Sequence, residues 1–407
     1  MDSDSVSGNT VAQIGPAAGG AGAADSPQRQ GRWRRYHAAV NGLTEYWYPA
    51  SLAKTVRRKK KHVQRIASHD ILFIFDNDKF FAVINECPHR LVPLSLGSLE
   101  FPGHIACGYH GWVFDLASGN LVAALSDGPD SPVVGKACVR TFPVEERAGV
   151  LWVWVGEGKP VPVEHDIPEE LLRPNAVIFP LLRQVKGNWR YAGENGFDEA
   201  HVKVLHRTAL WTFFRGIAAW NTTRITTSDD GKWINRFQEA VHLDDDYPGI
   251  GRWPKAKFWQ RANSGKPRTV YGSSDHCVSI RLPCMLRVKQ PGTADWTHYD
   301  WYTPVDADNY LYLALAVSWR RNPLKIFAWW FRFWSYILVI HHYWFNGQDL
   351  HIVGAMPESS PVRMFRPDVS IFAWRKLVEE YAREPNRPQK TLPPNRDFMT
   401  LDRDKAA

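Results

Sequence analysis

Two short stretches decide the fold of this chain: CPHR at residues 87–90 and CGYHGW at residues 107–112. Each contains one cysteine and one histidine, spaced Cys-x-His in the first and Cys-x-x-His in the second, with residues 90–106 between the two pairs. Thiolates and imidazoles are common ligands of iron and zinc in proteins. The candidate ligands are therefore Cys87, His89, Cys107 and His110.

This set of two thiolates and two imidazoles fits a Rieske [2Fe–2S] centre. In such a centre two cysteines bind one iron and two histidines bind the other, which raises the reduction potential above that of an all-cysteine cluster. A tetrahedral zinc site is the competing interpretation, because zinc also accepts two cysteines and two histidines. Zinc fingers usually pair cysteine with cysteine and histidine with histidine along the chain, so the mixed pairs favour the cluster.

A second group of candidate ligands lies in the stretch NGFDEAHVKVLH, residues 195–206. His201 and His206 are close enough in sequence for one helix, or its frayed end, to direct both toward one metal ion. Two histidines and one carboxylate on one side of Fe(II) leave the opposite positions open for O2 and substrate. Asp198 precedes His201 by three residues, so it can accept the ring N–H of that histidine and orient it.

The carboxylate that completes this site need not be local, and Asp349 in the stretch FNGQD, residues 345–349, is our candidate. Its charge favours it, because such a triad contains one anion. The competing groups are His341, His342 and His351 near it, and Glu194 and Glu199 beside Asp198. We interpret the histidines at 341 and 342 as capping or packing a helix, and the two glutamates as supporting or surface groups.

The two motifs together resemble those of the terminal oxygenase (α) components of Rieske non-haem iron oxygenases, over residues 47–377. In that family an all-β Rieske domain precedes a catalytic domain with a helix-grip (START-like) antiparallel sheet, and three subunits assemble head to tail. The resemblance implies an α+β fold, a [2Fe–2S] Rieske cluster, a mononuclear Fe(II) and a homotrimer.

The resemblance also implies a role for each candidate residue. Cys87 and Cys107 would bind one cluster iron and His89 and His110 the other, while His201, His206 and Asp349 would hold the mononuclear iron. Asp198 matches a family aspartate that bridges a Rieske histidine of one subunit to an iron-ligand histidine of the next. Asn195 matches a family asparagine that lies close to the iron and usually does not ligate it.

Three further segments, at residues 47–49, 195–198 and 373–377, look most like carbazole-type angular dioxygenases and oxygenases of phenoxybenzoates and diphenyl ethers. The two iron histidines, however, have four residues between them rather than the three of the carbazole pattern. That longer spacing also occurs in O- and N-demethylating monooxygenases. We therefore expect an oxidoreductase that uses O2 to dioxygenate a hydrophobic aromatic substrate. Monooxygenation, including demethylation, of an aromatic or other hydrophobic substrate is the alternative, and the pattern does not identify the substrate.

The chain shows no sequence signal of its own electron supply. It contains neither a Cys-x4-Cys-x2-Cys ferredoxin motif nor a Gly-rich dinucleotide fingerprint, so electrons are expected from a separate ferredoxin or NAD(P)H-dependent reductase. The net charge of +8 would attract an acidic partner. The basic run RRKKK at residues 57–61 stands alone, so nucleic-acid binding is not expected.

Five cysteines are present, and two of them belong to the cluster motif. The other three, Cys138, Cys277 and Cys284, show no paired spacing, which fits a reducing cytoplasm. We predict that Cys277 and Cys284 pack in the core.

Composition and turn signals suggest a division of the chain into consecutive segments. The Gly-, Ala- and Ser-rich start is typical of disorder and lacks the apolar core of a signal peptide. The expected segments are a disordered tail at 1–30, a helical or irregular lead-in at 31–46, the Rieske domain at 47–157, a linker at 158–170, the catalytic mononuclear iron domain at 171–390 and a tail at 391–407.

One apolar, tryptophan-rich stretch, residues 326–340, allows more than one interpretation. It is shorter than the about 20 apolar residues of a membrane-spanning helix. We expect a buried helix that carries Asp349 to the iron, with contact to a membrane surface as the alternative.

Two functions other than oxygenation remain open. The chain could be a purely electron-transferring Rieske protein, although residues 195–206 argue against this, or a zinc-binding interaction protein. The red-brown colour of an oxidised Rieske centre would exclude the zinc protein.

Overall fold

The computed structural model describes residues 33–206, 219–243, 246–247, 249, 251–252, 267–268, 277–289, 296–357, 365–385, 387 and 390–400. The predicted disordered tail at 1–30 and the last residues of the predicted C-terminal tail, 401–407, lie outside them. The domain boundaries proposed above remain predictions.

The N-terminal domain is all-β and contains three small antiparallel sheets with strand orders β1-β9-β8, β2-β3-β4 and β5-β6-β7. Its strands are β1 (Tyr46–Leu52), β2 (Lys61–Ile66), β3 (His69–Asp76), β4 (Lys79–Ile84), β5 (His104–Ala106), β6 (Trp112–Asp115), β7 (Leu121–Ala124), β8 (Val144–Arg147) and β9 (Val150–Val155), with α3 (Ala53–Lys59) and η2 (Leu94–Leu96) between them. The turn at Asn77 and Asp78 joins β3 to β4, and both residues have positive φ (46° and 57°). Positive φ at both central residues suits the right-handed twist of a two-residue hairpin.

The second domain is built on a large antiparallel sheet with the order β10-β19-β18-β17-β16-β12-β11-β20, to which β15 adds beside β12. Its strands are β10 (Ala176–Lys186), β11 (Ala219–Thr227), β12 (Ile234–Leu243), β15 (Pro267–Arg268), β16 (Cys277–Arg281), β17 (Met285–Lys289), β18 (Trp296–Pro304), β19 (Asn309–Trp319) and β20 (Asp397–Thr400); β13 (Asp246–Tyr247) and β14 (Gly251–Arg252) pair separately. The predicted fold class, α+β with an all-β first domain and an antiparallel catalytic sheet, is confirmed.

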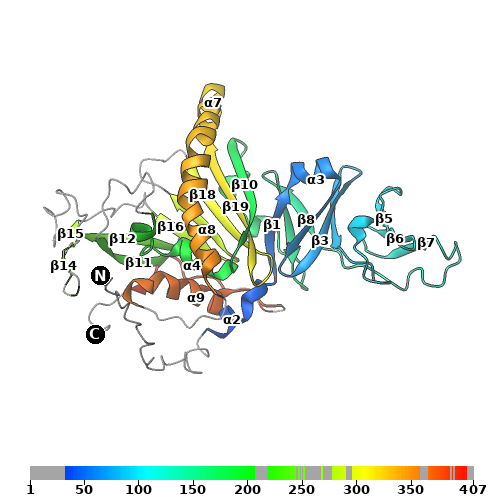
Figure 1. The fold of residues 1–407 in the computed structure, drawn as a ribbon, viewed down its shortest axis with the longest axis horizontal. Helices are drawn as coiled ribbons and strands as arrows, with labels where there is room; N and C mark the ends of the chain where they lie inside the picture. Colours follow the sequence, from blue (N-terminus) through cyan, green and yellow to red (C-terminus); the bar gives the residue numbers. More distant parts are fainter. Residues whose placement is uncertain are drawn as a thin grey trace, which may run out of the picture.

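Helices cover one face of this sheet. A continuous helical run, made of α7 (Pro323–Arg332), the π-helix η6 (Phe333–Phe345) and α8 (Asn346–Ala355), crosses the sheet in Figure 1, and α7 extends beyond it. Further helices among the described residues, which do not all lie on this face, are α2 (Arg34–Ala38), η1 (Ala39–Asn41), η3 (Val163–His165), η4 (Glu169–Leu172), α4 (Trp189–Phe197), α5 (Val202–Leu205), η7 (Arg366–Asp368) and α9 (Val369–Tyr381). The long run begins where Asn322 caps the helix by accepting from the Leu324 amide, with Pro323 at the first helical position.

The expected burial of residues 326–340 is wrong for one side of the helix, both in α7 and in the following η6, where Trp334 and Val339 are about half exposed. Phe327 is 64 % exposed and Phe331 is 61 % exposed, whereas Trp329, Phe333 and Ile337 are buried. A stripe of the helix therefore packs on the sheet while the rest of its apolar surface faces outward. Among the described residues no helix is long and apolar enough to cross a membrane.

The sheet lies between this helix and the N-terminal domain. Alternate residues of a strand point to opposite faces, and on β18 the face of Trp296 packs against Trp329 of the long helix. On the other face Trp301 packs edge-on against Trp152 of β9, with ring centroids 5.4 Å apart. The shared aromatic core makes the two domains one packed unit.

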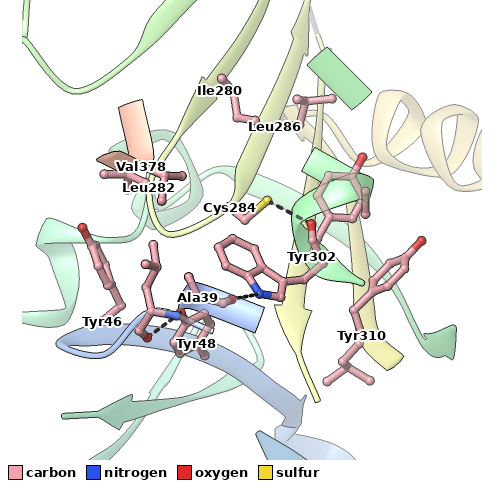
Figure 2. Packing of buried hydrophobic residues seen from close by; sticks show 14 of the residues in the cluster. Ala39, Tyr46, Tyr48, Ile280, Leu282, Cys284, Leu286, Tyr302, Tyr310 and Val378 are labelled. Atoms are coloured by element: carbon pink, nitrogen blue, oxygen red, sulfur yellow. Dashed lines mark hydrogen bonds between the residues drawn. The ribbon is translucent and has the colours of Figure 1, made fainter. Parts of the chain in front are cut away.

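The N-terminal lead-in is also built into the catalytic domain. Figure 2 shows Ala39, Tyr46 and Tyr48 close to Cys284 and Tyr302. The indole N–H of Trp189, the first residue of α4, donates to the Ala39 carbonyl oxygen at 2.8 Å. Cys284 is buried in this core, as predicted, whereas the side chain of Cys277 lies outside the described residues.

Candidate metal centres

The two loops that carry the four predicted cluster ligands meet in the N-terminal domain. The first follows β4 and the second joins β5 to β6. In each loop the backbone N–H of the cysteine donates to the carbonyl oxygen of the residue five positions later, at 2.9 Å for Cys87 and 2.8 Å for Cys107. The carbonyl oxygen of the same cysteine accepts from the backbone N–H of the residue four positions later, at 2.8 and 3.0 Å. The residues at that fourth position, Leu91 and Gly111, both have positive φ (60° and 67°). The two loops therefore fold the chain back in the same way.

This fold brings two thiols and two imidazoles together. Cys87 and Cys107 are buried, while the rings of His89 and His110 lie further out with centroids 4.6 Å apart. Burial raises the pKa of the Cys87 thiol to about 11, and its neighbour Cys107 adds to the shift. Thiolate ligation displaces such protons when a metal binds. Buried sulfur on one side and imidazole on the other is the donor set that a Rieske cluster requires.

Aromatic side chains surround the histidine side of this centre. The Trp112 ring stacks on His89, with centroids 4.8 Å apart and planes at 12°, and the Tyr109 ring lies 3.8 Å from that of His110. Arg90 donates to the Tyr109 hydroxyl at 3.4 Å. Because Tyr109 is 54 % exposed, this rim faces solvent and is available to another protein.

The second centre forms where α4 ends, α5 begins and α8 passes. The Nε2 atoms of His201 and His206 lie 3.3 and 3.2 Å from the same atom, Oδ1 of Asp349. The ligand atoms of the three residues all lie within 4.8 Å of one another. The structure therefore brings together all three residues predicted to hold the mononuclear iron.

The outer nitrogen of each histidine has its own partner. Nδ1 of His201 lies 3.2 Å from Asp198 Oδ2, and Nδ1 of His206 lies 2.9 Å from the Gln348 side-chain oxygen. Asn195 donates to Asp349 at 3.0 Å. Carboxylate and amide oxygens on the outer nitrogens fix the imidazoles so that their Nε2 atoms face the metal position. Sequence reasoning anticipated Asp198 and Asn195 but missed Gln348, the residue next to the predicted ligand.

Charge and burial both suit a cation at this position. His206 is completely buried, and burial alone would raise the pKa of Asp349, yet hydrogen bonds from the two histidines hold it below its usual range. For His201, burial alone would lower the pKa, but the hydrogen bonds and negative charges of Asp198 and Asp349 raise it to about 9. Two imidazoles and one ionised carboxylate on one side of the position fit the donor set of non-haem Fe(II).

The competing histidines lie elsewhere. His351 is exposed on α8. His341 and His342 are buried and contact His298 of β18, with ring centroids 4.7 and 5.0 Å away. Their side chains therefore pack the helix against the sheet, as the packing interpretation predicted, and do not cap it.

The two competing glutamates are occupied by structural contacts. Glu194 accepts from the Tyr36 hydroxyl at 2.6 Å and from Arg375 at 2.7 Å. Glu199 pairs with Arg236 at 2.5 Å. Both carboxylates are buried, so the surface interpretation is wrong for them: each neutralises a buried arginine.

A hollow of about 350 Å³ opens beside the second centre. Its lining includes Asn195, Asp198, His201, Val204 and Met356. Asp198 thus has His201 on one side and this hollow on the other.

Family models match most of the chain. A Rieske [2Fe-2S] domain model matches residues 46–143, and a homotrimeric ring hydroxylase model matches residues 154–229 and 259–385.

Individual relatives agree with these models. The chain is 28 % identical to the terminal oxygenase component of carbazole 1,9a-dioxygenase from Sphingomonas sp., over 86 % of this chain and 95 % of that protein. It is 32 % identical to a protein described as the iron–sulfur subunit of a toluene-4-sulfonate monooxygenase system from Comamonas testosteroni, over 63 % of this chain and 76 % of that protein. The solved terminal oxygenase of carbazole 1,9a-dioxygenase from Nocardioides aromaticivorans IC177 superposes with a TM-score of 0.71, 24 % identity and coverage of 86 % and 98 %.

Proposed function

Because this chain belongs to the homotrimeric ring hydroxylases that carry a Rieske [2Fe–2S] domain, we propose that it is a terminal oxygenase that dioxygenates a hydrophobic aromatic substrate. The observation that carries the proposal is the convergence of His201, His206 and Asp349 on one point in a chain that also presents the Cys/His loops. A relative of similar length, the carbazole dioxygenase component, supports dioxygenation.

The two metal groups divide the chemistry. When bound, the cluster would supply single electrons, and the mononuclear iron would supply open coordination positions for O2 and substrate. We propose Cys87, His89, Cys107 and His110 as the cluster ligands, and His201, His206 and Asp349 as the iron ligands. Around the iron position Asp198 and Gln348 orient the two imidazoles, while Asn195 holds the Asp349 carboxylate in place.

Electrons are proposed to cross between subunits. Figure 1 shows β5 and β6, which flank a cluster loop, at one end of the molecule, and α4 and α8 over the large sheet far from that end. A transfer within one chain would span this separation, so we propose that a neighbouring subunit of the homotrimer places its His110 at the hollow that Asp198 lines. Asp198 would then accept hydrogen bonds from both histidines and connect the two centres.

The electron donor is proposed to be a ferredoxin. A related solved structure is the reduced complex between oxygenase and ferredoxin in carbazole 1,9a-dioxygenase, with a TM-score of 0.72 and 23 % identity, over 87 % of this chain and 93 % of that one. The exposed rim at Tyr109 and Leu91 offers apolar contact surface next to the histidine side of the cluster. The net charge of +8 supports an acidic partner. A cytoplasmic location is part of the proposal, supported by the absence of any paired cysteine spacing outside the cluster motif.

Single-turnover product analysis tests the reaction type. Reduced, iron-replete protein would meet 18O2 and a panel of tricyclic aromatics, diaryl ethers and methoxy- or N-methyl-arenes, with products read by mass. Two labelled oxygens in one product are the expected result. One labelled oxygen, or release of formaldehyde, would instead establish monooxygenation or demethylation, the alternative that the toluene-4-sulfonate relative favours.

A further inference from the structure

Three histidines form a buried cluster between the large sheet and the long helix. His298 lies on β18, and His341 and His342 lie on the π-helix η6. All three are at least nine-tenths buried. Their rings contact one another, with centroids 4.7, 5.0 and 5.4 Å apart. The iron centre uses none of them, so their presence in the core needs another explanation.

One nitrogen of this histidine cluster, Nε2 of His298, is anchored by a carboxylate. Nε2 of His298 lies 2.8 Å from Asp300, whose carboxylate also accepts from the Tyr312 hydroxyl at 2.5 Å. Asn346, three residues before Asp349, donates to that hydroxyl at 2.7 Å. A series of hydrogen-bonded side chains therefore connects the histidine cluster to α8, the helix that carries Asp349.

Four ring nitrogens of the cluster have no hydrogen-bond partner: Nδ1 of His298, Nε2 of His341, and both nitrogens of His342. A buried polar group without a partner costs stability, and native proteins rarely leave several together. A bound molecule that hydrogen-bonds to these nitrogens would remove that cost.

The surroundings place the three histidines next to the proposed reaction site. The residue opposite His298 on β19 is Ala316, and the residue opposite Asp300 is Ala314, so small side chains flank the polar pair on the sheet. The Phe345 ring stacks on the iron-site histidine His206, with centroids 3.7 Å apart, and lies parallel to the His341 ring at 5.8 Å. One aromatic ring thus separates the cluster from an iron ligand.

The charge balance favours a neutral partner. Burial lowers the pKa of His341 to about 3. Burial also lowers the pKa of His342, and the neighbouring imidazoles and Arg183 lower it further. The Arg183 side chain donates to the His342 carbonyl oxygen and lies over the rings of Tyr312 and Tyr343. The Asp300 carboxylate is hydrogen-bonded to His298 and Tyr312. A neutral imidazole offers one N–H donor and one acceptor nitrogen, which matches a hydroxyl, ring N–H, ether or carbonyl group.

We propose that His298, His341 and His342 form the polar end of the substrate site, and that the substrate is an aromatic compound with a neutral hydrogen-bonding group. This inference rests on the proposed oxygenase function and deepens it. The cluster would hold the polar group while the hydrocarbon part of the same molecule reaches the iron. Plain hydrocarbons of the same shape would leave the imidazoles unpartnered and bind less tightly.

Three tricyclic compounds that differ at one bridging position test this directly: carbazole (N–H), dibenzofuran (O) and fluorene (CH2). Their binding to the iron-replete, oxidised protein would be measured by equilibrium dialysis without turnover. One net hydrogen bond of about 1.4 kcal/mol corresponds to about a tenfold change in Kd, so carbazole or dibenzofuran should bind about tenfold more tightly than fluorene. Equal affinity for all three, or no binding of any, would overturn the proposal, and this comparison needs no variant.

The variant His342→Leu then tests whether the histidine cluster causes this preference. It should lose the preference for the polar analogues over fluorene. His351→Leu, an exposed histidine on the same long helix, is the matched control and should keep it. If His342→Leu keeps the preference for the polar analogues and melts at a higher temperature, the histidine cluster holds only water and the proposal is wrong. If His342→Leu instead loses a bound metal ion that belongs to neither iron centre, the three histidines form a metal site and the substrate proposal is wrong.

Failure of the proposed function would look different. If the polar analogues bind with the expected preference but reduced protein and O2 yield no oxygenated product from any compound, the oxygenase assignment fails while the binding site stands. If products form but fluorene and carbazole bind equally, the oxygenase stands and the histidine site fails.

Discussion

The two metal centres of this chain are built in opposite ways. The four Cys/His residues sit on two surface loops, with the histidine side rimmed by exposed side chains such as Tyr109. The three His/Asp residues sit where helices meet over the large sheet, and His206 is completely buried. A centre that receives electrons from another protein needs a face in solvent, whereas a centre that activates O2 needs protection from it. Burial therefore separates the two tasks within one subunit.

The two centres also differ in how they are assembled from the sequence. The four proposed cluster ligands lie within one stretch of the N-terminal domain, and each loop closes through its own backbone hydrogen bonds. The iron centre joins residues far apart in the chain: His206 and its partner Gln348 are separated by 142 positions. Changes at the iron centre are thus expected to depend on the fold of the whole catalytic domain.

Loss of the buried carboxylate should have the largest effect. Asp349→Ala removes the anion of the triad, so we expect the mononuclear iron to be lost and turnover to fall by about three orders of magnitude or more. The cluster should remain, because no described contact connects the two centres within one chain. Iron analysis together with the visible spectrum of the cluster measures both. A variant that loses the cluster as well would contradict the independence of the two centres.

Asp198→Ala comes next, because it breaks the proposed connection between the centres and leaves both filled. Turnover should fall by about 100-fold, at the upper end of what partners of metal ligands contribute. Stopped-flow absorbance should show slow reoxidation of the reduced cluster by O2 in the presence of substrate. Asp308→Ala, at an exposed aspartate, serves as the control. Normal product formation in a metal-replete Asp198→Ala protein would rule the bridge out.

Gln348→Leu should have a smaller effect, confined to the buried centre. Without the amide oxygen at 2.9 Å, His206 loses the partner that orients its ring, and iron affinity should fall by about 10–100-fold. Competition with a chelator measures this, while the cluster spectrum should not change. Gln184→Leu, at an exposed position on β10, is the matched control. Unchanged iron affinity would show that packing alone holds His206.

The smallest effect is expected from Gly196→Ala in α4. A Cβ at this position would lie 2.6 Å from the Tyr302 hydroxyl and 3.1 Å from Leu286. Such overpacking costs about 1–3 kcal/mol of stability, seen as a lower melting temperature of the iron-loaded protein. In Gly347→Ala, where a Cβ meets nothing within 4 Å, the same change should stabilise α8 slightly. Equal effects at both glycines would mean that α4 can shift to make room.

The contrast between the centres also explains what the sequence could predict. The cluster loops are short local patterns, so residue types and spacing alone pointed to four candidate residues, and the structure brings these four together. His201 and His206 lie in one segment and were found in the same way, whereas the choice of Asp349 depended in part on the family resemblance. Gln348 carries no pattern of its own.

Other features depend on three-dimensional register and burial. The link from His298 through Asp300 to Tyr312 requires the pairing of β18 with β19, which hydropathy does not reveal. The partners of the two glutamates are likewise distant in the chain. The long helix was predicted as buried because its composition is apolar, but composition does not tell which side of a helix meets the sheet.

The outward side of α7 has a practical consequence for anyone who purifies this protein. Leu324, Phe327 and Phe331 are each more than half exposed, and no acidic residue occurs between positions 309 and 348, while Arg320 and Lys325 add positive charge. Apolar surface with cations and no anions adsorbs to plastic, to hydrophobic chromatography media and to denatured protein. Recovery should therefore improve with a mild non-ionic detergent, and a Phe327→Ser, Phe331→Ser double variant should elute earlier from a phenyl column without any change in colour.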